Sequence, residues 1–95
     1  MTAEKYILIT GAGSGLGRCI ALNFAQKGFS LALASLMATE LENIKNDIEA
    51  KHTNITVKTL AVDMLQANAH QTIAKWIDDE KIYLHGLVNN VGFGY

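Results

Sequence analysis

Several features that direct a sequence toward other architectures are missing or scarce in this chain of 95 residues. It contains no proline and no low-complexity tract, which excludes a proline-rich linker and favours one continuous domain over residues 1–95. Its single cysteine, Cys19, rules out an internal disulfide and fits a reducing compartment. We expect Cys19 to be a small packed residue on a helix, because free cysteine usually behaves as a buried apolar side chain.

The chain also has little net charge and no long apolar run. The formal net charge is −1, which gives no electrostatic case for binding nucleic acid or an anionic membrane surface. No apolar run approaches the roughly 20 residues that a bilayer-spanning helix needs, and the one near the N-terminus is too short for a secretory signal. We therefore expect a cytoplasmic protein with no nucleic-acid partner and no membrane partner.

What the sequence does contain is a regular alternation of short apolar runs with longer amphipathic stretches. This alternation is typical of an α/β fold in which helical crossovers connect parallel strands. The expected strands are residues 6–10, 30–34, 56–62 and 86–89. The expected helices are residues 15–27, a second that begins near Thr39, and residues 67–81. The run TELE predicts a capping box in which Thr39 and Glu42 close the first turn of the second helix.

The apolar residues of these helices recur at helical spacing, and we interpret them as core. They are Leu16, Ile20, Ala21, Phe24 and Ala25 in the first helix, Leu41, Ile44 and Ile48 in the second, and Ile73, Trp76 and Ile77 in the third. Gly28 follows the first helix as its C-terminal stop.

The stretch TGAGSGLGR lies where the first strand turns into the first helix. Glycines there permit positive φ and remove the Cβ atoms that would keep a phosphate from the unpaired N–H groups of the helix. The common dinucleotide spacing G-x-G-x-x-G fails when it starts at Gly11, because its last glycine falls on Leu16. The spacing T-G-x-x-x-G-x-G fits, with Thr10, Gly11, Gly15 and Gly17. Taken alone, such a turn can also be a close-packing device.

Two further polar signals follow the third and fourth strands. Asp63 stands in the run VDM, and Asn89, Asn90 and Gly92 stand in the run NNVG. Open α/β sheets bind ligands outside the carboxyl ends of their strands, so the sequence predicts one site at this edge. The alternative is structural, with Asp63 as a helix-capping carboxylate and the asparagines as turn formers.

With these three motifs the whole chain resembles the N-terminal part of the short-chain dehydrogenase/reductase family. The family's marks are T-G-x-x-x-G-x-G, an aspartate after the third strand, and N-N-A-G after the fourth, where Val91 replaces the alanine here. The resemblance implies a Rossmann-like three-layer fold with strand order 3-2-1-4, of which residues 1–95 are the N-terminal, NAD(P)-binding portion. The catalytic and substrate-binding portion follows the fourth strand in the family.

The resemblance also implies a set of residues that bind the dinucleotide. They are Thr10, Gly11, Ser14, Gly15, Leu16, Gly17, Ser35, Asp63, Met64, Asn89, Asn90 and Gly92. The residues of the glycine turn would line the pyrophosphate and ribose. Asp63 would bind the adenine amino group beside the backbone of Met64, and Asn89 would support the sheet and the cofactor ribose. Asn90 and Gly92 would shape the entry toward the nicotinamide.

The residues after the second strand bear on the choice between NAD and NADP. An acid there selects NAD, and an arginine accommodates the 2′-phosphate of NADP. Ser35 stands at the acidic position, Leu36 stands where the family's arginine is usual, and Ser14 stands where many NADP users carry a basic residue. Because no acid repels a 2′-phosphate and Ser35 could donate to it, we expect NADP in preference to NAD, with little selectivity.

The family's catalytic serine, and the tyrosine and lysine of Y-x-x-x-K, have no counterpart in these residues. Tyr6 is followed at that spacing by Thr10, and Tyr83 by Leu87. We expect the dinucleotide-binding part of a short-chain NAD(P)-dependent oxidoreductase that acts on an alcohol/carbonyl pair. We expect residues 1–95 by themselves to lack turnover. The alternative is a stand-alone, non-catalytic nucleotide-binding or regulatory module. A serine and Y-x-x-x-K downstream in the gene would favour the first, and a natural stop codon the second.

Ending the sheet at a fourth strand would leave that strand as an unpaired edge. It would also leave one face of the sheet covered by a single helix. Exposed apolar surface and an open edge favour self-association, so we expect a homo-oligomer that shares these surfaces.

Overall fold

The computed structural model describes residues 4–12 and 15–89. Strands and helices alternate as β1 (Tyr6–Thr10), α1 (Gly15–Gln26), β2 (Ser30–Ser35), α2 (Ala38–Lys51), β3 (Val57–Ala61), α3 (Ala69–Asp79) and β4 (Leu84–Asn89). The predicted alternation is confirmed, and the predicted ends that can be compared lie within two residues of those observed. The third helix is shorter than predicted at both ends. Lys81 has a positive φ of 54° just beyond it, a conformation that cannot continue a right-handed helix.

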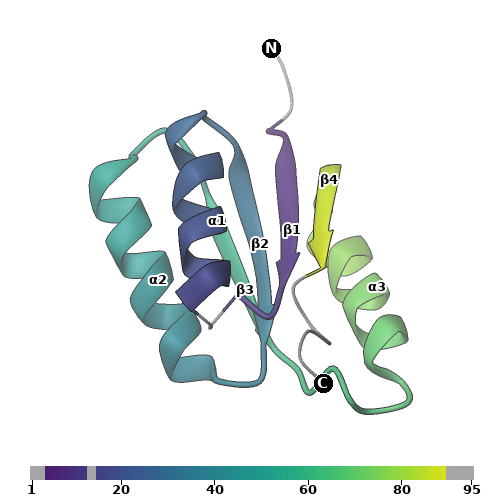
Figure 1. Ribbon diagram of the computed structural model, residues 1–95. Coiled ribbons are helices and arrows are strands. Elements are labelled where there is room, and N and C mark those ends of the chain that lie inside the picture. Colours follow the sequence, from purple (N-terminus) through teal and green to yellow (C-terminus); the bar gives the residue numbers. More distant parts are fainter. Residues whose placement is uncertain (1–3, 13–14, 90–95) are drawn as a thin grey trace.

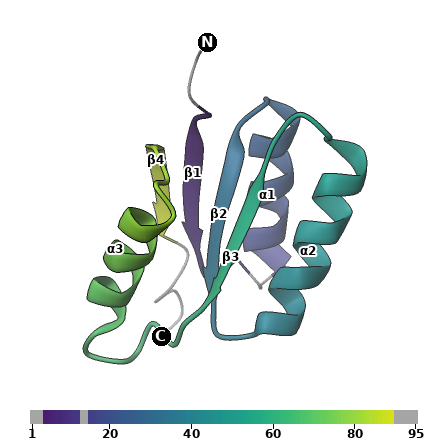
Figure 2. The ribbon, with the colours of Figure 1, turned by 180° about the vertical axis from the view of Figure 1, so that it is seen from behind.

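The four strands form one parallel sheet in the order β3-β2-β1-β4, as the resemblance implied. α1 and α2 lie on one face of the sheet, and α3 lies on the other (Figures 1 and 2). All strand arrows point the same way, and each helix runs back against them. The N-terminal ends of the helices therefore gather at the carboxyl edge of the sheet, which is the lower edge in Figure 1.

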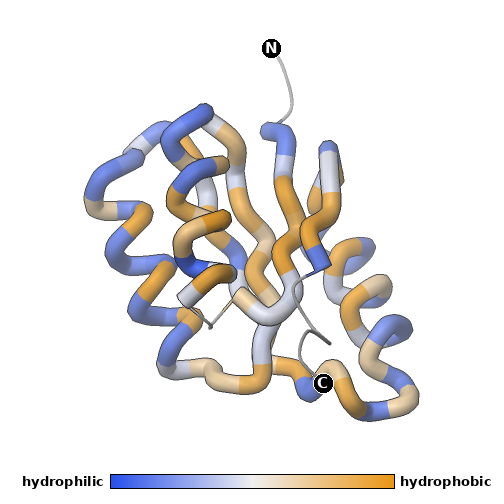
Figure 3. The backbone as a smooth tube through the Cα atoms, in the orientation of Figure 1, coloured by the Kyte–Doolittle hydropathy of each residue, from blue (hydrophilic) through white to orange (hydrophobic). Residues whose placement is uncertain are grey.

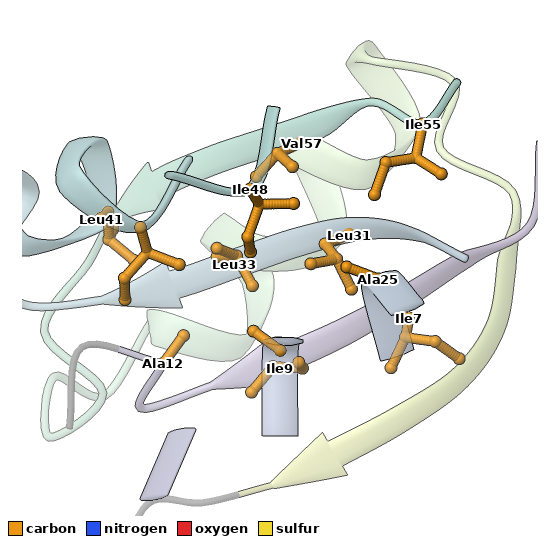
Figure 4. Packing of buried hydrophobic residues seen from close by; sticks show 12 residues of the cluster. Ile7, Ile9, Ala12, Ala25, Leu31, Leu33, Leu41, Ile48, Ile55 and Val57 are labelled. Atoms are coloured by element: carbon orange, nitrogen blue, oxygen red, sulfur yellow. The ribbon is translucent and has the colours of Figure 1, made fainter. Parts of the chain in front are cut away.

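The core has two parts because alternate residues of each strand face opposite sides of the sheet. On the α1 and α2 side, Ile7, Ile9, Leu31 and Leu33 pack with residues of both helices (Figure 4). On the α3 side, a smaller cluster contains Tyr6, Leu8, Ala32, Ala34, Ile73 and Ile82. The hydropathy of the backbone follows this arrangement, with apolar strands inside and polar outer helix faces (Figure 3). None of the helices within the described ranges has the length and apolar character needed to cross a membrane.

Most of the helical core prediction is confirmed. Ala21, Ala25, Leu41, Ile44, Ile48 and Ile73 are buried, and Ile20, Phe24, Trp76 and Ile77 are partly buried against the same clusters. Gly28 ends α1 in the left-handed region, with φ 91°. Leu16 was wrongly assigned to the core: it is 60% exposed, because it lies in the first turn of α1 at the rim of the sheet.

Two other local predictions are wrong. Cys19 is exposed, because the buried side of α1 is formed by Gly17, Ala21 and Ala25, four residues apart, and Cys19 lies off that stripe. The capping box is absent, because α2 begins one residue earlier than predicted. Its N-cap is Met37, which makes no side-chain hydrogen bond to the helix.

Candidate functional site

At the candidate site, a hydrogen bond between two side chains joins the carboxyl ends of β1 and β4. Thr10 ends β1 and Asn89 ends β4, and they are partners in the β1–β4 register. The Thr10 hydroxyl, on a residue only 4% exposed, donates to Oδ1 of Asn89 at 2.9 Å. The first and third predicted motifs therefore meet directly, although 79 residues separate them in the sequence.

The glycine turn is anchored to the neighbouring strand by its backbone. Gly11 has a positive φ of 70°, a conformation that glycine adopts without the steric cost that a Cβ imposes. The backbone N–H groups of Gly11 and Ala12 both donate to the carbonyl oxygen of Ala34, at 2.8 and 3.3 Å. These bonds fix the start of the turn over the end of β2. Ser14, which was predicted to line the pyrophosphate, lies outside the described residues.

Two glycines of the motif have different surroundings. A Cβ on Gly17 would lie 2.5 Å from the carbonyl oxygen of Gly11 and 2.7 Å from Cα of Ala12, so close packing of α1 against the turn requires glycine there. A Cβ on Gly15, the first residue of α1, would meet nothing within 4 Å among the described atoms. Packing inside the described protein therefore explains Gly17 and leaves Gly15 unexplained.

A cavity of about 280 Å³ opens between the ends of β2 and β3. Its lining residues are Gly11, Ser35, Leu36, Val62, Asp63, Met64 and Leu65. The backbone N–H of Val62 donates to the carbonyl oxygen of Ser35 at 2.8 Å, which holds the two walls together. The second predicted motif thus lies beside the first, and four of the predicted site residues share this cavity.

Asp63 closes the turn that follows β3. Its Oδ1 accepts from the backbone N–H of Leu65 at 3.0 Å, and its Oδ2 accepts from Nε2 of Gln66 at 3.5 Å. These contacts belong to a local turn, because α3 begins only at Ala69. The carboxylate is held at the cavity wall and stays partly exposed.

The sequence did not identify all of the cavity's walls. Leu36, Val62 and Leu65 line it but were not among the predicted site residues. Leu65 is 89% exposed in the connection after β3, and Leu36 is 62% exposed after β2. The available signal was the presence of large apolar residues in the connections that follow β2 and β3, outside the strands and helices. Asn90 and Gly92, predicted near the nicotinamide, lie outside the described residues.

The sheet is parallel, and a glycine turn opens at a helix N-terminus beside an apolar cavity at the carboxyl edge. This arrangement defines the Rossmann type of nucleotide-binding fold. The sequence matches the family model "short chain dehydrogenase" over residues 5–95. The chain belongs to the short-chain dehydrogenase family.

Similar proteins include reductases from animals and bacteria. The chain is 34% identical over 91 residues to very-long-chain 3-oxoacyl-CoA reductase-A of Danio rerio, covering 96% of this chain and 28% of that protein. It is 34% identical over 92 residues to the NADPH-dependent reductase BacG of Bacillus subtilis, covering 97% of this chain and 36% of that protein.

Solved structures give the same result for the fold. YwfH, an NADPH-dependent reductase involved in bacilysin biosynthesis, superposes with a TM-score of 0.88 at 33% identity, covering 98% of this chain and 37% of that one. L-sorbose reductase from Gluconobacter frateurii, in complex with NADPH and L-sorbose, has a TM-score of 0.88 at 27% identity, covering 98% and 35%. The chain therefore spans about a third of the length of these relatives.

Proposed function

We propose that residues 1–95 are the N-terminal, dinucleotide-binding portion of a short-chain NAD(P)-dependent oxidoreductase that interconverts an alcohol and a carbonyl group. The observation that carries the proposal is the meeting of the glycine turn, the apolar cavity and the joined ends of β1 and β4 at one edge of the sheet. A nicotinamide dinucleotide, when bound, supplies or accepts the hydride. The residues described here bind and orient it.

The glycine turn is the proposed binding site for the pyrophosphate. A Cβ at Gly15 would meet none of the described atoms at the N-terminus of α1, where backbone N–H groups and the helix dipole favour an anion. Glycine at this position keeps that space free for phosphate oxygens. The exposed Leu16 and the undescribed Ser14 complete the turn in this proposal, and Gly17 permits its close approach to α1.

The cavity between β2 and β3 is the proposed binding site for the adenosine half. Val62, Met64 and Leu65 offer apolar surface to the faces of an adenine ring, and the Asp63 carboxylate can accept from the exocyclic amino group. Ser35 ends β2 at the position that binds the adenosine ribose in this class of fold. Thr10 and Asn89 support the site from the adjacent ends of β1 and β4, and Asn90 and Gly92 are proposed to extend it toward the nicotinamide.

We favour NADP over NAD as the dinucleotide. Ser35 places no carboxylate at the end of β2, so nothing there repels a 2′-phosphate. The similarity to an NADPH-dependent reductase of Bacillus subtilis and to an L-sorbose reductase crystallised with NADPH supports the same choice.

The isolated segment is proposed to bind without catalysing hydride transfer. It contains no Y-x-x-x-K, so it supplies neither the proton-donating tyrosine nor the lysine that the family uses. A stand-alone binding or regulatory module remains the alternative. A downstream serine and Y-x-x-x-K in the gene would decide for the oxidoreductase, and a stop codon after Tyr95 would decide for the module.

We also propose that the isolated segment forms a homo-oligomer. β4 lies at one edge of the described sheet, and apolar side chains are exposed on it and just before it. They are Tyr83, Leu84 and Leu87, exposed by 70%, 39% and 62%. An open strand edge beside exposed apolar surface favours pairing with a second copy.

Calorimetric titration of the purified chain with NADPH and NADH tests the proposed function. We expect saturable binding of both, tighter for NADPH, and a loss of binding in Gly15→Val because its side chain occupies the proposed phosphate space. Gln26→Val, at an exposed position at the other end of α1, is the matched control and should bind as the wild type does. If the folded wild-type chain binds neither dinucleotide, the proposal is wrong.

A further inference from the structure

The positive charges of the chain are distributed unevenly between the two edges of the sheet. The sequence has eight lysine and arginine residues, and all eight lie in the described ranges. Arg18, the fourth residue of α1, is the only one in the first turn of a described helix. The others lie at the start of strands, in or beyond the second turn of helices, or past helix C-terminal ends: Lys5, Lys27, Lys45, Lys51, Lys58, Lys75 and Lys81.

This distribution matters because helix N-termini gather at the carboxyl edge of the sheet, where the proposed site lies (Figure 1). Among the lysine and arginine residues, Arg18 is the one that its position in the first turn of a described helix brings to this edge. Leu36 stands where the family resemblance implied an arginine for the 2′-phosphate, and it has no charge.

The partner that Arg18 has in the described protein is exchangeable. Its guanidinium pairs with the carboxylate of Asp47 on α2, and the two side chains are 41% and 50% exposed. Exposed ion pairs contribute little to stability, because both groups remain largely hydrated. The guanidinium can therefore leave Asp47 for a phosphate dianion at little cost.

There is also space for an anion beside Arg18. A cavity of about 250 Å³ is lined by Arg18, Glu40, Asn43 and Ile44, between α1 and the N-terminal half of α2. The short connection formed by Leu36 and Met37 links the end of β2 to this helix. The cavity therefore begins a few residues beyond Ser35, on the same side of the sheet as the glycine turn.

We propose that Arg18 is the residue that recognises the 2′-phosphate of NADP(H) and so sets the dinucleotide preference, an inference that rests on the proposed function. A guanidinium binds phosphate through two parallel N–H donors, and a 2′-hydroxyl offers no charge to match. The Asn43 amide is a second donor on the same cavity. Glu40 lines it too, and its carboxylate opposes a phosphate, which limits the selectivity.

The test compares the affinities of four forms of the chain for NADPH and for NADH by calorimetry. Arg18→Gln is expected to weaken NADPH binding by about tenfold to a hundredfold, the range for loss of a charge-assisted contact, and to leave NADH binding unchanged. Asp47→Asn breaks the same ion pair but keeps the cation, and it is expected to strengthen NADPH binding. Lys45→Gln removes one positive charge from the second turn of α2 and should leave the ratio of the two affinities unchanged.

Circular dichroism first establishes that each variant is folded. An unchanged ratio in Arg18→Gln, with a wild type that binds both dinucleotides, overturns the assignment of Arg18 and leaves the proposed function standing. Equal weakening of both dinucleotides in Arg18→Gln and Asp47→Asn shows that the ion pair is structural, and also overturns the assignment. Failure of the folded wild type to bind either dinucleotide overturns both.

Discussion

At the residue scale, the glycines of one short motif meet two separate demands. The backbone of the turn in front of Gly17 leaves no room for a side chain there, whereas a Cβ on Gly15 would meet none of the described atoms. A sequence pattern treats the two positions alike. The structure shows that the fold requires glycine at Gly17, and the requirement at Gly15 is one that we assign to a ligand by proposal.

This difference predicts that stability and binding respond to different substitutions. Gly17→Ala places its Cβ against backbone atoms, 2.5 Å from the carbonyl oxygen of Gly11, and is expected to lower the free energy of unfolding by about 1–3 kcal/mol, as overpacking does. Gly15→Ala has no such contact and should change that free energy by less than about 1 kcal/mol. Urea unfolding followed by circular dichroism measures both. Equal losses in the two variants would contradict the prediction.

At the scale of elements, the alternation of strands and helices was predictable because each element has its own apolar period. The motifs also predicted the edge of the sheet at which Thr10, Asp63 and Asn89 gather. Details that depend on one residue of register were less predictable. The capping box failed because α2 begins at Ala38 and Thr39 already lies inside the first turn.

The walls of the cavity were not predictable for a different reason. Leu65 reaches the cavity because Asp63 binds its backbone N–H and closes the turn after β3. The sequence supplies the aspartate, but which of its possible hydrogen bonds forms depends on the path of the chain between β3 and α3.

The opposite, amino edge of the sheet holds a polar contact that joins three segments. The Ser30 hydroxyl at the start of β2 donates to the carboxylate of Glu4, before β1, and accepts from the backbone N–H of Thr56, before β3. The hydrogen bond from Ser30 is the main reason that the pKa of Glu4 lies below its ordinary value of 4.5. The ionised form of Glu4 is therefore the one that the fold stabilises.

This lowered pKa predicts the direction of a pH effect on stability. The contribution of Glu4 is present above its ordinary pKa and is lost as the pH falls through the lowered pKa. Glu4→Gln should therefore be less stable than the wild type at neutral pH, and the difference should shrink between about pH 5 and pH 3. Thermal unfolding across this range measures it, with the exposed Glu42→Gln as a control for net charge. Parallel curves for wild type and Glu4→Gln would contradict the prediction.

At the scale of the whole molecule, the two outer strands of the described sheet, β3 and β4, differ in how they are protected from pairing with another strand. At the β3 edge, a carboxylate oxygen of Glu49 on α2 accepts from the backbone N–H of Val57 at 3.3 Å, and the Lys58–Glu80 ion pair lies beside it. An outer strand that carries charged side chains and has a backbone N–H already hydrogen-bonded is a poor template for strand pairing. The β4 edge instead carries the exposed Leu84 and Leu87.

This asymmetry predicts which edge mediates the proposed self-association. Sedimentation velocity of the isolated chain should show dimers or larger species at micromolar concentration, and Leu87→Lys should shift them toward monomer. Leu65→Lys adds the same charge at a more exposed leucine, 89% against 62%, but at the carboxyl edge, and should leave the distribution unchanged. A stable monomer in the wild-type sample would count against the proposal.

The pairing of β4 with β1 also bears on the order in which the chain folds. β1, α1, β2, α2 and β3 are connected by short turns, whereas β4 must return across the length of the chain to lie beside β1. Contacts between distant segments carry a larger loop-closure entropy and tend to form late. During synthesis, residues 4–61 can therefore gather most of the larger core before β4 leaves the ribosome. The Thr10–Asn89 hydrogen bond, which spans 79 residues, is then expected to form after these contacts, so the candidate site is completed late in the folding of this part of the chain.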